Sequence, residues 1–132
     1  MGLSNGKATD RFKEGIPVKN YSLGLGALGL PGDFSSASRF IRALFVKENS
    51  VSGDSERSNV NQFLHILSSV AMPKGCVQAS EGFEYTRYSS CCNVDKGIYY
   101  YTTYDNFEIT SINMYGVDLD QSHLYDYYVK WL

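Results

Sequence analysis

The chain has 132 residues, so 1–132 is one domain or a piece of one, and its 43% hydrophobic and 20% charged content is ordinary for a globular protein. Its 12 Lys and Arg and 14 Asp and Glu are scattered without a basic stripe, which argues against nucleic acid as a partner. The longest uninterrupted apolar runs are far too short to cross a bilayer, so we expect no membrane span.

The first thirty residues carry few structural signals. Residues 1–20 are polar and have no period of 2 or 3.6, which predicts a loop, and residues 21–30 could form a glycine-interrupted strand. Gly24-x-Gly26-x-x-Gly29 formally fits the dinucleotide-binding fingerprint. We reject that interpretation, because Pro31-Gly32 falls where the fingerprint's helix should run and no βαβ unit follows.

The chain's opening residues lack a basic segment followed by an apolar core, so we expect no signal peptide. The cysteines number three, which is odd, and two of them are adjacent, so a disulfide framework is not indicated. Both observations favour a cytoplasmic protein.

Two amphipathic helices are predicted next, over 35–47 and 56–71. In the first, apolar residues recur at helical spacing at Ala37, Phe40, Ile41, Leu44 and Phe45. Candidate N-caps are Asp33, Ser35 or Ser36 for the first helix and Asp54 or Ser55 for the second. The short polar link between the helices predicts that they pack antiparallel in one layer.

The second half is rich in tyrosine and predicts antiparallel strands over 83–93, 98–104 and 107–114, separated by turns at 93–97 and 105–106. Segment 119–132 is apolar and aromatic but aperiodic, and we expect it to dock on another part of the fold. The predicted fold class is α+β, with a pair of helices on an antiparallel β meander.

Metal-ligand and nucleophile patterns are weak. His65 and His123 form no cluster, and the acidic residues of the tail lack metal-loop spacing, so we expect no metal and no cofactor: Asp118, Asp120 and Asp126. Cys91 and Cys92 would point to opposite faces of one strand, which makes one of them a small core residue.

Arg39 is the one candidate for a catalytic role. An arginine just inside a helix, after a glycine-rich approach, can clamp an oxyanion or tune the pKa of a nucleophile. The alternative is a surface or ion-paired arginine, and spacing alone favours that alternative.

Segment 28–40, LGLPGDFSSASRF, resembles the choloylglycine hydrolase family, which comprises bile salt hydrolases and penicillin V acylases. The resemblance continues in order through 49–56 (NSVSGDSE), 62–67 (QFLHIL) and 88–106 (YSSCCNVDKGIYYYTTYDN). It covers nearly all of the chain, and the bile salt hydrolase branch is the nearer one.

The resemblance implies an N-terminal nucleophile (Ntn) hydrolase with a four-layer αββα sandwich, usually a homotetramer, that cleaves the amide bond of glycine- or taurine-conjugated bile salts. It implies a cysteine that becomes the first residue after processing, with its own α-amine as the base. An aspartate, two asparagines and an arginine complete such a site. Of these, only the arginine falls in this sequence, at Arg39, where it would favour the thiolate.

The chain opens with Met1-Gly2 rather than Met-Cys, so the resemblance is to the family's C-terminal part. We therefore expect no activity from this chain alone unless an N-terminal part of the enzyme supplies the cysteine. Processing to free Cys76 would leave too little chain to build a site. The alternative is a non-catalytic protein that keeps this part of the fold for binding or assembly. In either case an apolar face and strand edges would be left uncovered, which predicts poor solubility, partial order or self-association of the isolated chain.

Overall fold

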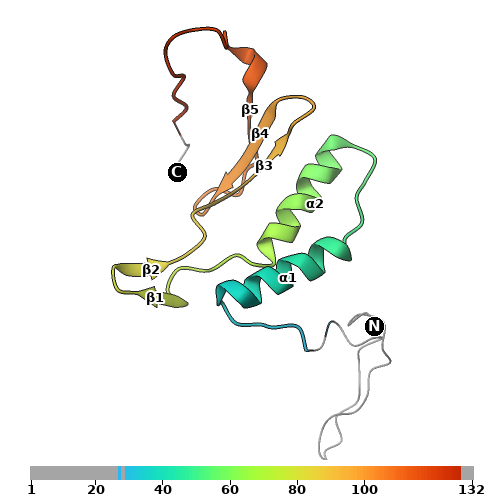
Figure 1. Cartoon of the computed structure of the whole chain (residues 1–132), viewed down its shortest axis with the longest axis vertical. Coiled ribbons are helices and arrows are strands. Elements are labelled where there is room, and N and C mark those ends of the chain that lie inside the picture. The colour runs from blue at the N-terminus through green and yellow to red at the C-terminus, as the bar shows by residue number, and fades with distance from the viewer. Residues whose placement is uncertain (1–26, 28, 129–132) are drawn as a thin grey trace, which may run out of the picture. The chain divides into compact units, whose positions relative to one another are not determined.

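A computed structural model describes residue 27 and residues 29–128 of the chain. The chain divides into two compact units, Met1–Arg42 and Ala43–Leu132. The elements are, in order, α1 (Ser36–Glu48), α2 (Glu56–Ser68), β1 (Val77–Ala79), β2 (Gly82–Glu84), β3 (Tyr88–Asn93), β4 (Ile98–Thr103), β5 (Thr110–Asn113) and a 3-10 helix at Met114–Gly116 (Figure 1). Two helices followed by antiparallel strands confirm the predicted α+β class.

Both helices begin where their caps predict. The Ser35 hydroxyl oxygen accepts a hydrogen bond from the Ser38 backbone N–H at 3.3 Å, ahead of α1. In the same way, Ser55 caps α2 by accepting from the Ser58 N–H at 3.2 Å. Each hydroxyl satisfies a backbone donor that has no partner within the first helical turn. Since α1 crosses the boundary between the two units, the antiparallel packing of the helices stays a prediction.

The end of α2 comes at Ser68 rather than at the predicted Ala71. The Ser68 hydroxyl donates to the Leu64 carbonyl at 2.8 Å, and the Ser69 hydroxyl donates to the Ile66 carbonyl at 2.6 Å. Serine side chains that bond to helical carbonyls compete with the next backbone donors. The helical spacing of apolar residues therefore continues to Ala71, although the helical backbone ends at Ser68.

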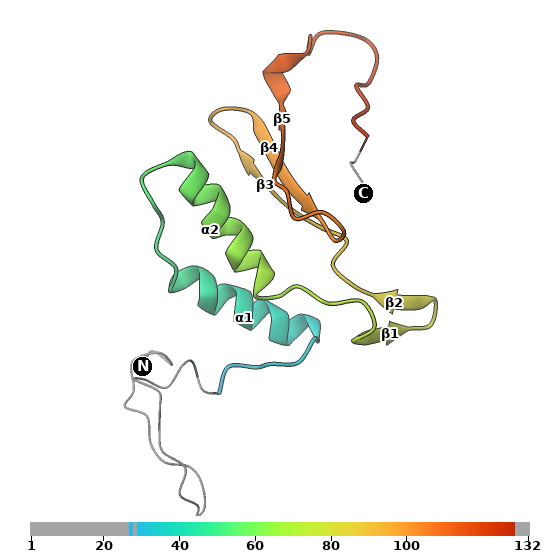
Figure 2. The same ribbon diagram turned by 180° about the vertical axis from the view of Figure 1, so that it is seen from behind.

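Strands β3, β4 and β5 form an antiparallel meander, as predicted. Their register pairs Tyr88 with Thr103 at one end of the first ladder, and Tyr101 with Thr110 in the second. α2 contacts β3, which Figure 2 shows from the rear. Among the described residues the buried apolar side chains are Val60 of α2 and Tyr101 of β4.

The predicted single strand over 83–93 is wrong. β2 pairs with the short strand β1, which the sequence analysis missed, whereas β3 belongs to the three-stranded sheet. Between them, the Thr86 backbone N–H donates to the Met72 carbonyl at 3.0 Å, and the Thr86 hydroxyl accepts from the Met72 N–H at 2.9 Å. These two hydrogen bonds hold residue 86 against the segment after α2, so a continuous β-ladder cannot pass through it.

The third predicted strand, 107–114, is shortened to Thr110–Asn113. The Asn106 carbonyl accepts from the Thr103 N–H at 2.9 Å, and the Asn106 side chain accepts from the Glu108 N–H at 2.9 Å. Asparagine holds a turn by such bonds to nearby backbone. The turn predicted at 105–106 is therefore present but extends into residues 107–109.

Several predictions on the chain's ends fall outside the described part: the loop over 1–20, most of the strand over 21–30, and Gly24 and Gly26 of the rejected fingerprint. Residues 119–128 are all exposed, so the predicted docking surface for the tail is not provided by the described residues. No helix within the described part of the chain is long and apolar enough to cross a membrane.

Replacing Gly53 with alanine is expected to destabilise the chain by about 1–3 kcal/mol, the usual cost of overpacking. A Cβ at Gly53 would lie 2.7 Å from the Ser58 Cβ, and the Gly53 N–H is held by the Asn59 side chain at 2.9 Å. Unfolding followed by circular dichroism in urea measures the change.

The control is a double substitution, Gly53→Ala with Ser58→Gly, which removes the clashing side chain at a cost of about 0.5–1 kcal/mol for a glycine within α2. We expect the two changes to be strongly non-additive, with the double variant more stable than Gly53→Ala alone. Simple additivity would contradict the close approach.

Candidate functional site

Arg39 lies on the first turns of α1 and is half-buried. Its backbone N–H donates to the Ser35 carbonyl at 2.9 Å, a bond that belongs to the opening of the helix. The stem of the side chain is thus attached to regular backbone rather than to a loop. A helix position restricts where the guanidinium can reach, and this suits a residue that must lie close to a reacting group.

Asp33 organises the backbone just ahead of α1. One carboxylate oxygen, Oδ1, accepts from the Ser35 N–H at 2.8 Å, and the other, Oδ2, accepts from the Ser38 hydroxyl at 2.5 Å. Hydrogen bonds from Ser35 and Ser38 hold the pKa of Asp33 far below its usual range. The group is therefore a permanent carboxylate at any physiological pH.

Arg42 holds the same approach segment from the next turn of α1. Its Nη1 donates to the Pro31 carbonyl at 2.9 Å and to the Asp33 carbonyl at 3.0 Å. From the sequence, Asp33 is only one of three candidate caps of this helix, and no role is predicted for Arg42. The two charged side chains that bond to this segment, Asp33 before Arg39 and Arg42 after it, were therefore missed.

A second polar cluster surrounds Glu56 at the start of α2. Its Oε1 accepts from the Asn93 side-chain amide at 2.5 Å and from the Tyr100 hydroxyl at 3.0 Å, and its Oε2 accepts from the Lys96 ammonium at 2.6 Å. The Lys96 hydrogen bond, followed by that of Asn93, lowers the pKa of Glu56, and the same contact raises the pKa of Lys96. This cluster fixes α2 to the hairpin of β3 and β4.

Replacing Glu56 with glutamine is expected to make the free energy of unfolding less dependent on pH in the acid range. Because the Glu56 pKa is lowered from 4.5 in the folded chain, its stabilising effect is complete above that pH and is lost as the pH falls through the folded value. Lys96 and Tyr100 have raised folded pKa values, so their effect is present below their ordinary values of 10.5 and 10.0 and is lost at higher pH. Urea midpoints between pH 3 and pH 7 test the acid limb, over about the range in which a carboxylate titrates.

Glu81→Gln, an exposed carboxylate between β1 and β2, is the matched control and should leave the profile unchanged. Lys96→Met removes the Lys96 bond to Glu56 but keeps Glu56 in the first turn of α2, where a negative charge is favourable. This variant therefore separates the effect of the cluster from the effect of the helix position. A constant difference between the original chain and Glu56→Gln across this pH range would contradict the prediction.

A cleft of about 600 Å³ lies in the second unit. Its walls come from the end of α2, the segment after it, β3, β4 and residues 107–109, and they include Leu64, His65, Met72, Tyr104 and Phe107. His65 thus lines a cleft, but the lining is mostly apolar. A space of this kind suits apolar contact more than acid–base chemistry.

The remaining candidate residues are dispersed. His123 lies with its ring 5.2 Å from that of Tyr125, in the exposed tail. Within residue 27 and residues 29–128, no three His, Cys, Asp or Glu side chains are grouped so as to hold a metal ion. This region includes Asp118, Asp120 and Asp126.

Cys91 and Cys92 differ in exposure, as neighbouring strand positions do, but neither of them is the core residue that was predicted. Cys91 is half-buried and Cys92 is exposed on the same strand, and burial raises the pKa of the Cys91 thiol. Cys76 is exposed in the segment before β1. A thiol whose pKa is raised is a poorer nucleophile at neutral pH, so Cys91 is suited to packing.

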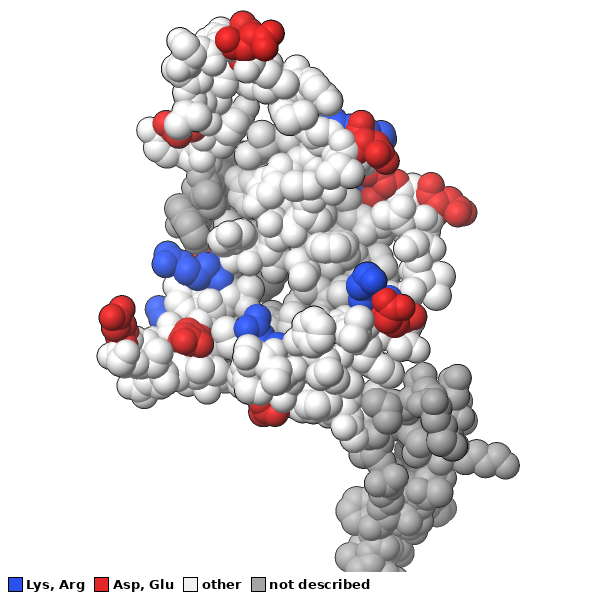
Figure 3. All heavy atoms as spheres, in the orientation of Figure 1, with Lys and Arg blue, Asp and Glu red and all other residues white. Residues whose placement is uncertain are grey.

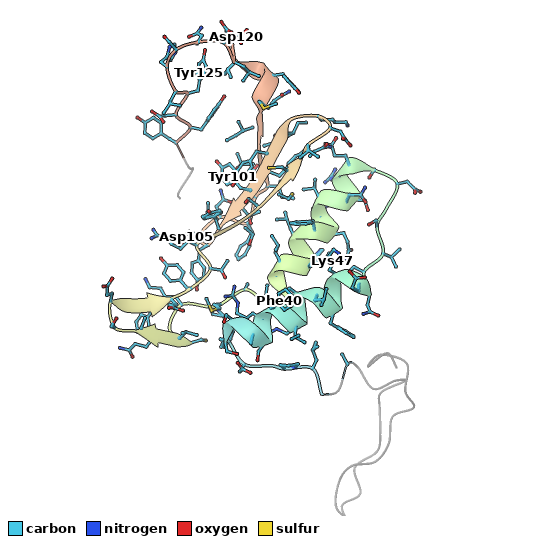
Figure 4. The ribbon with its side chains drawn as sticks, viewed as in Figure 1. Phe40, Lys47, Tyr101, Asp105, Asp120 and Tyr125 are labelled. Carbon is cyan, nitrogen blue, oxygen red and sulfur yellow. The ribbon has the colours of Figure 1, made fainter. Side chains whose placement is uncertain are left out.

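The charged side chains are interspersed. On the face shown in Figure 3, neither Lys and Arg nor Asp and Glu form a continuous patch. Large apolar side chains are exposed both in and between the elements, among them Phe40 of α1 at 66% and Phe107, between β4 and β5, at 84%. Figure 4 labels Phe40 on α1 and Tyr101 on β4, which differ sharply in exposure.

Comparison with known proteins identifies bile salt hydrolases among the relatives of this chain. The family of linear amide C–N hydrolases called the choloylglycine hydrolase family matches residues 1–127. A bile salt hydrolase/transferase of Lactiplantibacillus plantarum is 50% identical over 126 residues, which are 95% of this chain and 39% of that protein. The bile salt hydrolase/transferase of Clostridium perfringens is 42% identical over 105 residues, which are 79% of this chain and 32% of that protein.

Two crystal structures of the conjugated bile acid hydrolase of Clostridium perfringens share the fold. A mutant gives a TM-score of 0.74 at 39% identity and covers 90% of this chain and 37% of its own. A second variant gives 0.77 at 37% identity, with 98% and 40% covered. The chain thus spans about two fifths of the length of its relatives, 39% for the Lactiplantibacillus protein. With residues 1–127 matched, the chain belongs to the choloylglycine hydrolase family of linear amide C–N hydrolases.

Proposed function

We propose that this chain supplies one part of a conjugated bile salt hydrolase, an enzyme that cleaves the amide bond joining a bile acid to glycine or taurine. The observation that carries the proposal is the 50% identity to a bile salt hydrolase/transferase across 95% of this chain. The nucleophile comes from polypeptide beyond these 132 residues, since the relatives are more than twice as long as the matched region.

In this proposal Arg39 is the residue of this chain that acts in the active site. Its guanidinium lies beside the nucleophilic cysteine and stabilises the thiolate, which attacks the amide carbonyl. Arginine suits the role because it stays charged at every working pH and presents several donors in a fixed plane. The half-buried position of Arg39 on regular helix supports this assignment.

Co-expression tests the proposal. The 132-residue chain is produced with the part of the Lactiplantibacillus enzyme that it does not match, and release of glycine or taurine from conjugated bile salts is measured. We expect turnover from the pair and none from either part alone. Association of the two parts without turnover would contradict the proposal. Turnover by the 132-residue chain alone, abolished by replacing Cys76, Cys91 or Cys92, would overturn it.

The finer assignments belong to the same proposal. We infer Ntn-hydrolase chemistry, a four-layer αββα sandwich in the assembled enzyme, a homo-oligomer, and bile salts rather than penicillin V as the preferred substrate. The identity to bile salt hydrolases supports the last point. A cytoplasmic location agrees with three free cysteines in the described part of the chain, because thiols persist in reducing compartments.

The second candidate function is a non-catalytic binding or assembly protein. The mostly apolar cleft of about 600 Å³ favours it, together with exposed aromatic side chains such as Phe107. Titration with conjugated bile salts and sedimentation of the chain alone test this candidate. Saturable binding or a defined oligomer, with no turnover in the co-expressed pair, would favour it over the hydrolase.

A further inference from the structure

The segment just before α1, residues 31–35, is joined to the helix by two sets of hydrogen bonds, and Asp33 takes part in both. Its carboxylate accepts from the Ser35 N–H at 2.8 Å and from the Ser38 hydroxyl at 2.5 Å. Its carbonyl, with that of Pro31, accepts from the Arg42 guanidinium at 3.0 and 2.9 Å. The carboxylate and the carbonyl of one residue therefore hold successive turns of the helix.

Arg39 lies between the two points of attachment. Ser38 immediately precedes it, and Arg42 follows it by about one turn of an α-helix. Its own N–H bond to the Ser35 carbonyl, at 2.9 Å, closes the turn that begins at Ser35, whose N–H is held by Asp33. Any rotation of this turn would carry the Arg39 side chain with it, because the direction of a helical side chain follows its backbone.

We propose that Asp33 is the positioning residue for Arg39: through Ser35 and Ser38 it fixes the helix turn from which the guanidinium projects. The inference rests on the proposed role of Arg39 in the active site. A reacting group displaced by about 1 Å can lose about a hundredfold in rate, so a device that fixes one turn of helix has a measurable effect on turnover. A carboxylate suits the position because it accepts both bonds at once. Its negative charge is also stabilised by the positive end of the helix dipole at the N-terminus of α1.

Four variants separate the bonds. Asp33→Ala removes both, whereas Ser38→Ala removes one and leaves the Asp33–Ser35 bond in place. Asp33→Asn is the conservative variant, because asparagine keeps an oxygen for the Ser35 N–H and its amide can donate to the Ser38 hydroxyl. Asp54→Ala, at an exposed acidic residue ahead of α2, is the matched control.

The first measurement needs no activity. In nuclear magnetic resonance spectra of the 132-residue chain, the Arg39 Nε–Hε signal is compared between variants for its shift and its order on the picosecond–nanosecond scale. We expect lower order in Asp33→Ala, a smaller loss in Ser38→Ala, and nearly original values in Asp33→Asn and Asp54→Ala. An Arg39 signal that is unchanged in both Asp33→Ala and Ser38→Ala overturns the proposal, whatever the outcome of the co-expression test.

The second measurement uses the co-expressed pair. We expect Asp33→Ala to lower kcat about tenfold or more with KM nearly constant, Ser38→Ala to give a smaller loss, and Asp33→Asn to restore most of the rate. Equal losses in Asp33→Ala and Asp54→Ala overturn the proposal. Should Arg39→Ala itself leave turnover intact, the proposed role of Arg39 fails, while the spectroscopic result still decides whether Asp33 fixes its position.

Discussion

Replacing Arg39 with alanine in the co-expressed enzyme is expected to lower kcat for conjugated bile salts by about 10²-fold or more, the usual loss when one electrostatic group is removed from an active site. The physical reason is twofold. Without the neighbouring positive charge the pKa of the nucleophilic thiol rises, so less thiolate is present at neutral pH. The transition state also loses a nearby positive charge. We therefore expect the acid limb of the pH–rate profile to move to higher pH.

Arg39→Lys separates charge from geometry. Lysine keeps the positive charge but lacks the planar set of donors, so an intermediate rate is expected, with a smaller displacement of the acid limb. Arg87→Ala, at an exposed arginine just before β3, is the control and should leave both rate and pH profile unchanged. An Arg39→Ala enzyme with the original rate and profile would show that Arg39 is the surface arginine that spacing alone favours.

The features predicted correctly from sequence are those decided by neighbours in the chain. Helix starts follow from a serine three residues ahead of the donor that it satisfies, as with Ser55 and Ser58. The turn at 93–97 follows from Asn93, whose side chain accepts from the Lys96 N–H at 3.1 Å, and from Gly97 with a φ of 60°. Such bonds span few residues, so a local pattern is sufficient to predict them.

Two of the missed features concern bonds between distant residues, whereas the early end of α2 and the shortened third strand come from local serine and asparagine bonds. The Thr86–Met72 pair that divides the predicted strand joins residues 14 positions apart. The partners of Glu56 lie 37, 40 and 44 positions away, at Asn93, Lys96 and Tyr100. No periodicity within a helix or strand encodes which distant group its first residue will meet, and the cluster at the start of α2 was therefore missed.

The apolar face of α1 was predicted from spacing, but spacing does not say what covers it. Among the described residues of α1 none is buried, and Phe40, Ile41 and Leu44 are exposed. Arg39 shows the same limit for function. Its helix position follows from the pattern, whereas its proposed role comes from the resemblance of segment 28–40 to a family of hydrolases. A periodic pattern thus fixes the helix, and only homology suggests what its side chains do.

The largest effect on stability is expected at Tyr101. Its side chain is only 7% exposed and lies in β4, the central strand of the meander, between Ser90 of β3 and Thr110 of β5. Replacing a buried aromatic residue with alanine costs about 3–5 kcal/mol, which is a large share of a typical 5–15 kcal/mol of total stability. We expect the lower end of this range, because Val60 and Tyr101 are the only buried apolar side chains among the described residues, so few groups surround the vacated space.

Tyr99 provides the matched comparison, since it lies two residues earlier on the same face of β4 with its ring centre 6.0 Å from that of Tyr101. Its side chain is 37% exposed, so Tyr99→Ala should cost clearly less, and Tyr128→Ala in the exposed tail should cost almost nothing. Tyr101→Phe tests the hydroxyl separately. Urea unfolding of the four variants gives the order. If Tyr99→Ala proved as destabilising as Tyr101→Ala, burial of the central strand would not be what stabilises this sheet.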